Sequence, residues 1–342
     1  MKRIPRNSEK FGTIDLFDAI GSKQGFKLGD ADSEKAFLES ISKSFREKTP
    51  IILHGRRVEA MFAYVAASLG RCAAIKQEDS GEIFTSDPAV RVPDYRLVLR
   101  DGKQLLVEVK NCHKIDPCYR YSIKASYIGD LKLYADLFQI ELRLALYWSR
   151  WNQWVLISPE DMELDGAKYF ITFVDACKRN QMSSLGDKMV GTTPPLGFRL
   201  LTDSTKPRQI DKTGHVAFTI GGVELCCAGR VILEKAERNI AFYLILYGNW
   251  PASEPVAQIE NDELIAMDYI ARPVEETPGQ GFEIVGSLSG MISRHYNNLT
   301  APTGHIDRLT PAVDPATLGI SLPDNYKGRH LPLWRLVLQP AD

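Results

Sequence analysis

The clearest structural signal in this chain is a tight turn. The tetrapeptide Arg100-Asp101-Gly102-Lys103 separates two β-type segments, residues 95–99 and 104–109. Asp-Gly between such segments is the strongest short-range indication of a β-hairpin, because glycine adopts the positive φ that the turn requires. The two strands must then pair antiparallel, so the start of the first lies opposite the end of the second.

The hairpin brings charged side chains together at its open end. Residues two apart in a strand point to the same face, so Glu108 and Lys110 share one face. The opposite face carries Val107 and Val109, which can pack into a core. Asp94 begins the first strand and is expected near the end of the second. Two carboxylates and one ammonium beside an apolar core are costly unless all have partners.

These three side chains suit metal-assisted hydrolysis. Two carboxylates with open positions are a usual way to hold Mg²⁺, which keeps several waters and binds substrate phosphate. The ion lowers the pKa of a bound water and neutralises charge that builds on the phosphate. A neighbouring lysine can orient the attacking water, or take its proton if the pKa of the lysine is depressed. Asp94, Glu108 and Lys110 are therefore the candidate catalytic residues.

The motif Pro93-Asp94, followed after a hairpin by Glu108-Val109-Lys110, resembles the PD-(D/E)XK nuclease superfamily. That superfamily includes restriction endonucleases, archaeal Holliday-junction resolvases and many repair and phage-defence nucleases. The resemblance implies Mg²⁺ dependence, with Mn²⁺ as a substitute. It also implies Asp94 and Glu108 as metal ligands, a further ligand in the Val109 carbonyl, and Lys110 as the residue that activates water. It covers roughly residues 55–158.

Two neighbouring positions compare differently with the superfamily. Many members add an acidic residue from the preceding helix, and Glu59 fits that position; the alternative is a solvated glutamate paired with Arg56. Many members carry Gln-x-x-x-Tyr on the following helix, whereas this chain has Asp130-Leu-Lys-Leu-Tyr134. That departure leaves the role of the following helix open.

The order of periodic segments predicts an α/β (α+β) fold. Apolar residues at helical spacing predict helices over residues 31–48, ended by Pro50, and over residues 55–69. After the hairpin, a helix is expected at 122–140, strands at 142–148 and 154–157, and a helix at 166–179. This order implies a mixed β-sheet flanked by helices, and the resemblance makes it restriction-endonuclease-like.

The character of the chain changes after about residue 181. Gly, Thr and Pro over residues 186–195 are typical of a linker, and short strands are expected at 216–220, 223–227, 231–233, 240–247 and 333–338. A helix is expected at 287–297. Three units are predicted: an N-terminal arm and helix (1–50), a nuclease-like domain (51–185), and a C-terminal β-rich or winged-helix-like domain (190–342) for substrate or partner recognition.

Basic and aromatic residues alternate directly after the candidate site. This combination follows a phosphate backbone and stacks bases, so DNA is the favoured partner and RNA is not excluded. The formal net charge is −1, so binding must depend on local basic surface. The predicted nucleic-acid contacts are Lys114, Arg120, Lys124, Tyr127, Lys132 and Tyr134.

Several other classes of protein find no support. The chain has no GxxxxGK[ST] motif for ATP hydrolysis, and its cysteines show no CxxC spacing, which disfavours a zinc site at Cys112, His113 and Cys118. The longest apolar segment, about residues 240–247, is far short of the ~20 residues that span a bilayer. A soluble protein in the cytoplasm, without a membrane partner, is expected.

Two functions remain open from the sequence. The first is a metal-dependent endonuclease that hydrolyses phosphodiester bonds in DNA. The second is a catalytically inactive, nuclease-like DNA- or protein-binding subunit of a defence or repair complex, favoured by the near-neutral charge and the unassigned C-terminal half. A homodimer would suit double-strand cleavage, which needs two active sites, and the C-terminal half would suit a protein partner.

Overall fold

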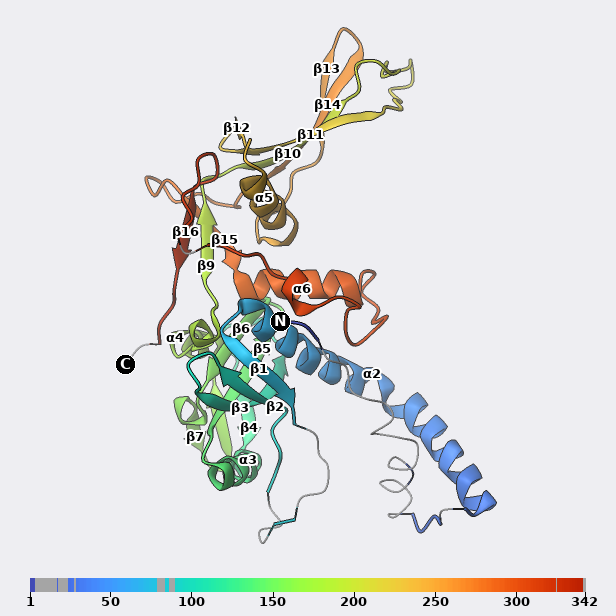
Figure 1. The fold of residues 1–342 in the computed structure, drawn as a ribbon, viewed down its shortest axis with the longest axis vertical. Coiled ribbons are helices and arrows are strands. Elements are labelled where there is room, and N and C mark those ends of the chain that lie inside the picture. Colours follow the sequence, from blue (N-terminus) through green and yellow to red (C-terminus); the bar gives the residue numbers. More distant parts are fainter. Residues whose placement is uncertain are drawn as a thin grey trace.

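A five-stranded mixed sheet forms the centre of the first half of the chain (Figure 1). The computed structural model describes residues 1–3, 17, 24–27, 29–78, 84–85, 90–323 and 325–340. Strands β3 and β5 pair parallel, and the other neighbours pair antiparallel. The order across the sheet is β1 (Cys72–Gln77), β2 (Tyr95–Leu99), β3 (Gln104–Cys112), β5 (Glu141–Trp148) and β6 (Gln153–Ile157).

Strands β2 and β3 form the predicted hairpin. Tyr95 pairs with Val107 and Leu97 with Leu105, in antiparallel register. Gly102 has a φ of 89°, and its N–H donates to the Leu99 carbonyl over 3.0 Å. A side chain larger than hydrogen would be strained at that φ, so the Asp-Gly turn is confirmed together with its physical reason.

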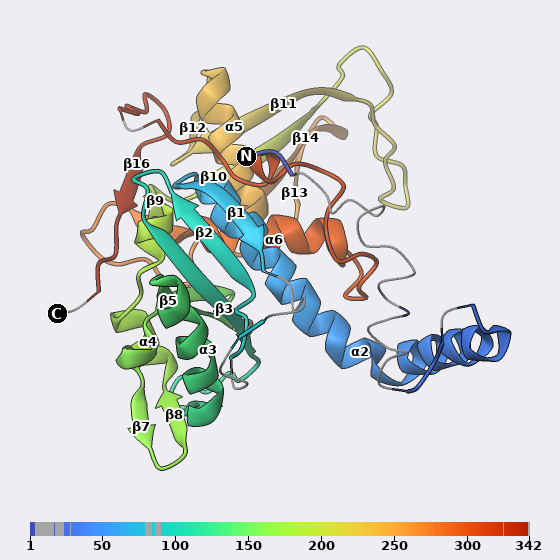
Figure 2. The ribbon, with the colours of Figure 1, turned by 60° about the horizontal axis from the view of Figure 1, so that its bottom comes forward.

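Helices cover both faces of the sheet (Figure 2). Tyr95, Leu97, Val107 and Val109 belong to a hydrophobic cluster with residues of α2 (Ala31–Leu69) and α6 (Leu288–Thr300). Leu106, Leu144 and Leu146, which alternate with them, pack with α3 (Ala125–Phe138) and α4 (Phe173–Lys178). The predicted mixed α/β fold, a sheet flanked by helices, is confirmed.

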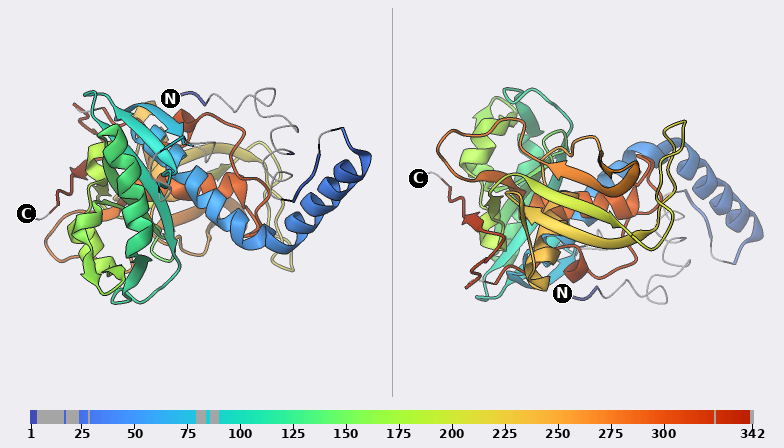
Figure 3. Two further views of the ribbon diagram at one scale, coloured as in Figure 1. Left: turned by 90° about the horizontal axis from the view of Figure 1, so that it is seen from below. Right: turned by 90° about the horizontal axis from the view of Figure 1, so that it is seen from above.

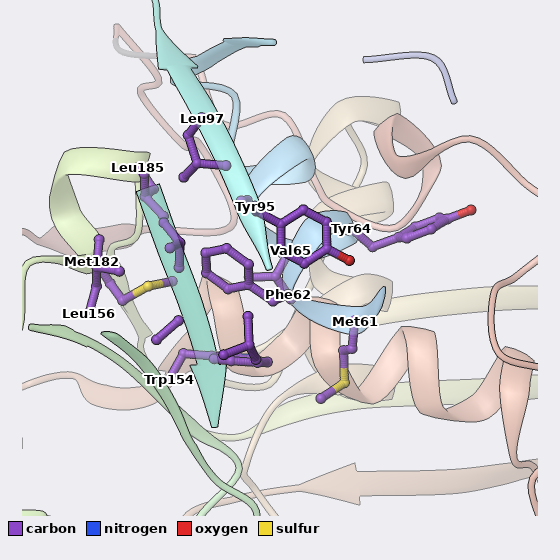
Figure 4. Close-up of a cluster of buried hydrophobic side chains, with 14 of the residues drawn as sticks. Met61, Phe62, Tyr64, Val65, Tyr95, Leu97, Trp154, Leu156, Met182 and Leu185 are labelled. Carbon is purple, nitrogen blue, oxygen red and sulfur yellow. The ribbon is translucent and has the colours of Figure 1, made fainter. Parts of the chain in front are cut away.

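Aromatic rings fill the cluster on the α2 face (Figure 4). Trp154 lies 5.5 Å from Phe62 and 4.7 Å from Tyr147, measured between ring centroids. Its indole N–H donates to Ser293 Oγ of α6 over 2.9 Å. Helix α6 is therefore joined to the sheet by a hydrogen bond as well as by apolar packing.

Helix α2 corrects the prediction of two helices separated at Pro50. It is a single helix of 39 residues that begins after Asp30, whose side chain accepts from the Ser33 N–H over 3.0 Å. It ends at Gly70, which has a φ of 86°. Proline removes one helical hydrogen bond and favours a kink without having to end the helix. Figure 3 shows α2 changing direction along its length.

The segment predicted as one helix over residues 166–179 is a strand followed by a short helix. Strand β8 (Lys168–Ile171) lies between β4 (Tyr121–Lys124) and β7 (Glu163–Asp165) in a three-stranded sheet. Only then does α4 begin, where Thr172 Oγ1 accepts from the Asp175 N–H over 3.2 Å. Pairing of β4 with β8 also explains why α3 begins at residue 125 rather than 122.

The C-terminal half is rich in β-structure, as predicted. One sheet has the order β12 (Arg230–Val231), β11 (Ile220–Cys227), β10 (Leu196–Thr202), β14 (Glu263–Ala271), β13 (Val256–Glu260). A second has the order β15 (Glu283–Ser287), β9 (Met189–Thr192), β16 (Leu333–Leu336). The expected linker at 186–195 is wrong, since it contains the central strand β9. The expected strand at 240–247 is also wrong, since it belongs to helix α5 (Lys235–Tyr247).

Helix α6 belongs to two hydrophobic clusters at once. Its Ile292 and Tyr296 pack in the cluster of α2 and the first sheet, and its Met291 packs in the C-terminal cluster with residues of α5. The domain boundaries predicted from the sequence remain a prediction, but the two halves share this helix. Within the described ranges, no helix is both long and apolar enough to cross a bilayer.

Candidate active site

The open end of the hairpin places Asp94 near Glu108. The register of β2 and β3 ends with the pair Tyr95–Val107, and Asp94 and Glu108 are the residues next to that pair. The Val109 N–H donates to Asp94 Oδ2 over 2.7 Å, and the Asp94 carbonyl accepts from the Glu78 N–H over 3.0 Å. The backbone of two neighbouring segments therefore positions Asp94.

Glu108, which is buried, and Lys110, which is half-buried, form an ion pair on the α3 face of the sheet. Glu108 is 3% exposed, and its Oε1 accepts a hydrogen bond from Lys110 Nζ. The hydroxyl of Tyr127, from the first turn of α3, donates to the same oxygen. Lys110 Nζ also donates to the Tyr127 hydroxyl over 3.1 Å. The expected convergence of Asp94, Glu108 and Lys110 at one end of the hairpin is confirmed.

The electrostatics of the two carboxylates favour a cation. Burial, followed by the nearby negative charge of Glu108, raises the pKa of Asp94 from 3.8 to about 7. A pair of carboxylates in a poorly hydrated place is unfavourable when both are ionised, and a bound cation removes that penalty. Asp94 Oδ1 and Glu108 Oε2 accept no hydrogen bond from any residue that the structure describes. Among the described residues, each carboxylate thus has one oxygen that accepts a hydrogen bond and one that does not.

This arrangement fits Mg²⁺, although it is a small donor set. In the described part of the chain, the structure contains no group of three or more histidine, cysteine or acidic residues that could hold a metal. Mg²⁺ commonly binds through one or two carboxylates, with waters and substrate phosphate completing its shell. Asp94 and Glu108 are the residues that would hold it here.

Lys110 is a cation in this environment. Burial disfavours its charged form, but the Glu108 carboxylate and the Tyr127 hydroxyl outweigh that effect and raise the pKa of Lys110. Lys110 could take a proton from water only if its pKa were depressed, and here its pKa is raised. A protonated lysine can still orient water and stabilise negative charge.

Glu59 lies on α2, at the edge of this site. Its carboxylate pairs with Arg56 over 3.3 Å, as the alternative interpretation expects. Its negative charge also contributes to the raised pKa of Asp94 and of Tyr95, so it lies within electrostatic reach of Asp94. The role of Glu59 as a third metal ligand, like that of the Val109 carbonyl, remains a prediction.

Two of the predicted nucleic-acid contacts have acidic partners on the neighbouring hairpin and turn. Arg120 pairs with Glu163 over 3.0 Å and with Asp165 over 3.6 Å. Lys132 pairs with Glu160 over 2.5 Å. A phosphate backbone would have to compete with these carboxylates for both cations.

The other four lie in different surroundings. Lys114 and Lys124 are exposed and form no ion pair with any described residue. Tyr134 is buried, and its ring lies 4.7 Å from that of Phe138. Tyr127 points into the candidate site, where its hydroxyl contacts Glu108 and Lys110. The alternation of basic and aromatic residues in the sequence did not predict these contacts.

Comparison with known proteins adds little to this geometry. No protein-family model matches the chain, and no curated protein matches it. Among solved structures, the chain is similar to Hjc, a Holliday junction resolvase from the archaeal hyperthermophile Archaeoglobus fulgidus. The two are 18% identical, with 30% of this chain and 77% of that chain covered and a TM-score of 0.25. A likeness at this level carries no argument about the site.

Proposed function

We propose that this chain is a metal-dependent nuclease of the PD-(D/E)XK kind that hydrolyses phosphodiester bonds in DNA. The observation that carries the proposal is the placement of Asp94 near Glu108 and the Lys110 ammonium at one end of the hairpin. Each carboxylate has one oxygen that accepts no hydrogen bond from a described residue. Homodimer formation, and a protein partner or substrate recognition through the C-terminal half, are further parts of the proposal.

Each residue of the site has a separate proposed role. Asp94 and Glu108 would hold Mg²⁺, and the bound ion would supply an activated water and charge neutralisation. Lys110, held as a cation by Glu108 and Tyr127, orients the water and stabilises negative charge on the phosphate. Val109 supports the site through its N–H, which fixes Asp94.

Replacement of Lys110 tests the proposal directly. We expect Lys110→Met to lower the rate of Mg²⁺-dependent DNA cleavage about a hundredfold, the effect typical of losing one positioned charged group. Linear, supercoiled, branched and single-stranded DNA, and RNA, should each be incubated with and without Mg²⁺ to find the preferred substrate. Wild-type protein that cleaves none of them with Mg²⁺ or Mn²⁺ would contradict the proposed function.

Lys103→Met is the matched control. Lys103 lies at the other end of the same hairpin, where it pairs with Glu141 over 2.9 Å at the surface. Its replacement removes the same charge from the same hairpin but should leave the cleavage rate unchanged. Equal losses in both variants would indicate a general effect on the hairpin rather than a role for Lys110.

The exposed lysines next to the site should contribute to DNA binding. Lys114→Ala and Lys124→Ala should each reduce the slope of log affinity against log salt concentration by about 1, as expected when one phosphate contact is lost. Binding can be measured with Ca²⁺ in place of Mg²⁺ to prevent cleavage. Lys103→Ala should leave the slope unchanged, and slopes that match the wild type in all three variants would place the DNA elsewhere.

A further inference from the structure

The hydroxyl of Tyr127 joins the acidic and the basic member of the candidate site. It donates to Glu108 Oε1 and accepts from Lys110 Nζ over 3.1 Å. A phenol has one proton to donate and lone pairs with which to accept, so one hydroxyl can serve both partners. Because Glu108 is buried and Lys110 is half-buried, water competes weakly for these hydrogen bonds.

The ring of Tyr127 is held as well as its hydroxyl. The guanidinium carbon of Arg91 lies 4.4 Å from the ring centroid, and Lys110 Nζ lies 4.8 Å from it. Arg91 is itself attached to α3, because its N–H donates to the Asp130 carbonyl over 3.0 Å. Residues 91–94 are contiguous, so one short segment carries both the cation that packs on Tyr127 and the candidate ligand Asp94.

We propose that Tyr127 is a positioning residue for the candidate metal site, an inference that rests on the proposed function. Its hydroxyl holds Glu108 by Oε1 and leaves Oε2 for the cation. The same hydroxyl gives the Lys110 ammonium a second acceptor. Without it, Lys110 would have Glu108 as its one hydrogen-bond partner among the described residues, and would compete more strongly with a divalent cation for that carboxylate.

Calorimetric titration of Mn²⁺ into the full chain tests this role. Tyr127→Phe keeps the ring, and hence its packing against Arg91, and removes the hydroxyl alone. We expect the dissociation constant for Mn²⁺ to rise about 10- to 100-fold, the effect typical of losing a hydrogen bond to a metal ligand. The Mg²⁺ concentration needed for half-maximal cleavage should rise in parallel, and saturating Mg²⁺ should restore much of the lost rate.

Tyr121→Phe is the matched control. Tyr121 is a neighbouring, half-buried tyrosine on β4, and its hydroxyl forms no hydrogen bond in the part of the chain that the structure describes. This variant should bind Mn²⁺ as the wild type does. Circular dichroism in EDTA should show that both variants are folded.

The outcomes separate the two proposals. Equal Mn²⁺ affinity in the wild type and Tyr127→Phe, with binding lost in Asp94→Asn, would contradict the positioning role and leave the metal site intact. A wild-type chain that binds no Mn²⁺ would overturn the metal site itself, and the role of Tyr127 with it. A loss of cleavage rate in Tyr127→Phe that saturating Mg²⁺ does not restore would point to a disturbed fold and would also count against positioning.

Discussion

Asp94→Asn is expected to lower the rate of Mg²⁺-dependent DNA cleavage by at least about a thousandfold. Asparagine has nearly the same shape and can still accept the hydrogen bond that the Val109 N–H donates to Oδ2. It lacks the negative charge, which contributes most to the binding of a divalent cation by a carboxylate. Single-turnover cleavage of labelled DNA, with Mg²⁺ varied, measures the loss.

The stability of the same variant gives an independent readout. In the folded protein the pKa of Asp94 is raised from 3.8 to about 7, first by burial and then by Glu108. The folded state therefore binds the proton more tightly than the unfolded state, so this group lowers the stability as pH rises from about 4 to about 7. Above about pH 7 the penalty is complete. In EDTA, Asp94→Asn should escape this penalty and be at least as stable as the wild type there.

Asp136→Asn provides the control for this substitution. Asp136 is an exposed residue of α3, and the same chemical change there should leave both cleavage and stability unchanged. Cleavage by Asp94→Asn at more than about a tenth of the wild-type rate would show that Asp94 is not a metal ligand. A marked loss of stability in EDTA would instead mean that the Asp94 charge is neutralised by a partner in the folded protein.

The part of this site that could be predicted is the part determined by local sequence. The Asp-Gly turn determines the register of β2 and β3, and this register places Asp94 and Glu108 next to its last pair, Tyr95–Val107. Alternation along β3 separates Val107 and Val109 from Glu108 and Lys110. These inferences need neighbours within one hairpin, and they are confirmed residue by residue.

The contacts made by Tyr127 and Arg91 depend on how α3 packs on the sheet. No spacing rule connects residue 127 with residue 108, and the segment that carries Arg91 reaches α3 through a backbone hydrogen bond to Asp130. Short apolar segments raise a similar difficulty. Residues 240–247 suit a strand or a helix, and burial of Ile240, Tyr243 and Leu244 at helical spacing appears only in the folded chain.

The site also depends on the half of the chain that the motif does not cover. Arg57 of α2 donates to Asn297 over 2.5 Å and to Thr300 over 3.2 Å, both on α6. These bonds and the Trp154–Ser293 bond attach α6 to the helix that carries Glu59 and to the sheet that carries the hairpin. A C-terminal helix thus completes the core beneath the candidate site.

Tyr296→Ala is therefore expected to destabilise the candidate nuclease core by about 3–5 kcal/mol, the cost typical of removing a large buried aromatic side chain. Tyr296 is fully buried, its ring packs edge-on against Tyr64 at 5.4 Å, and its hydroxyl donates to the Leu309 carbonyl. Urea unfolding followed by tryptophan fluorescence measures the loss, because Trp154 lies in the same cluster. Tyr296→Phe, which loses only the hydrogen bond, should cost about 1 kcal/mol and provides a milder variant if the alanine protein does not fold.

Leu299→Ala is the control on the same helix, since Leu299 is 38% exposed and its truncation should cost no more than about 0.5 kcal/mol. Removal of the Tyr296 ring opens a cavity against α2, and the core that supports the hairpin is expected to shift. Cleavage activity should therefore also fall, even at a temperature where the variant remains folded. A cost for Tyr296→Ala as small as that for Leu299→Ala would mean that α6 does not pack against α2 in solution. In that case the N-terminal half would have to bury Phe62 and Trp154 without α6.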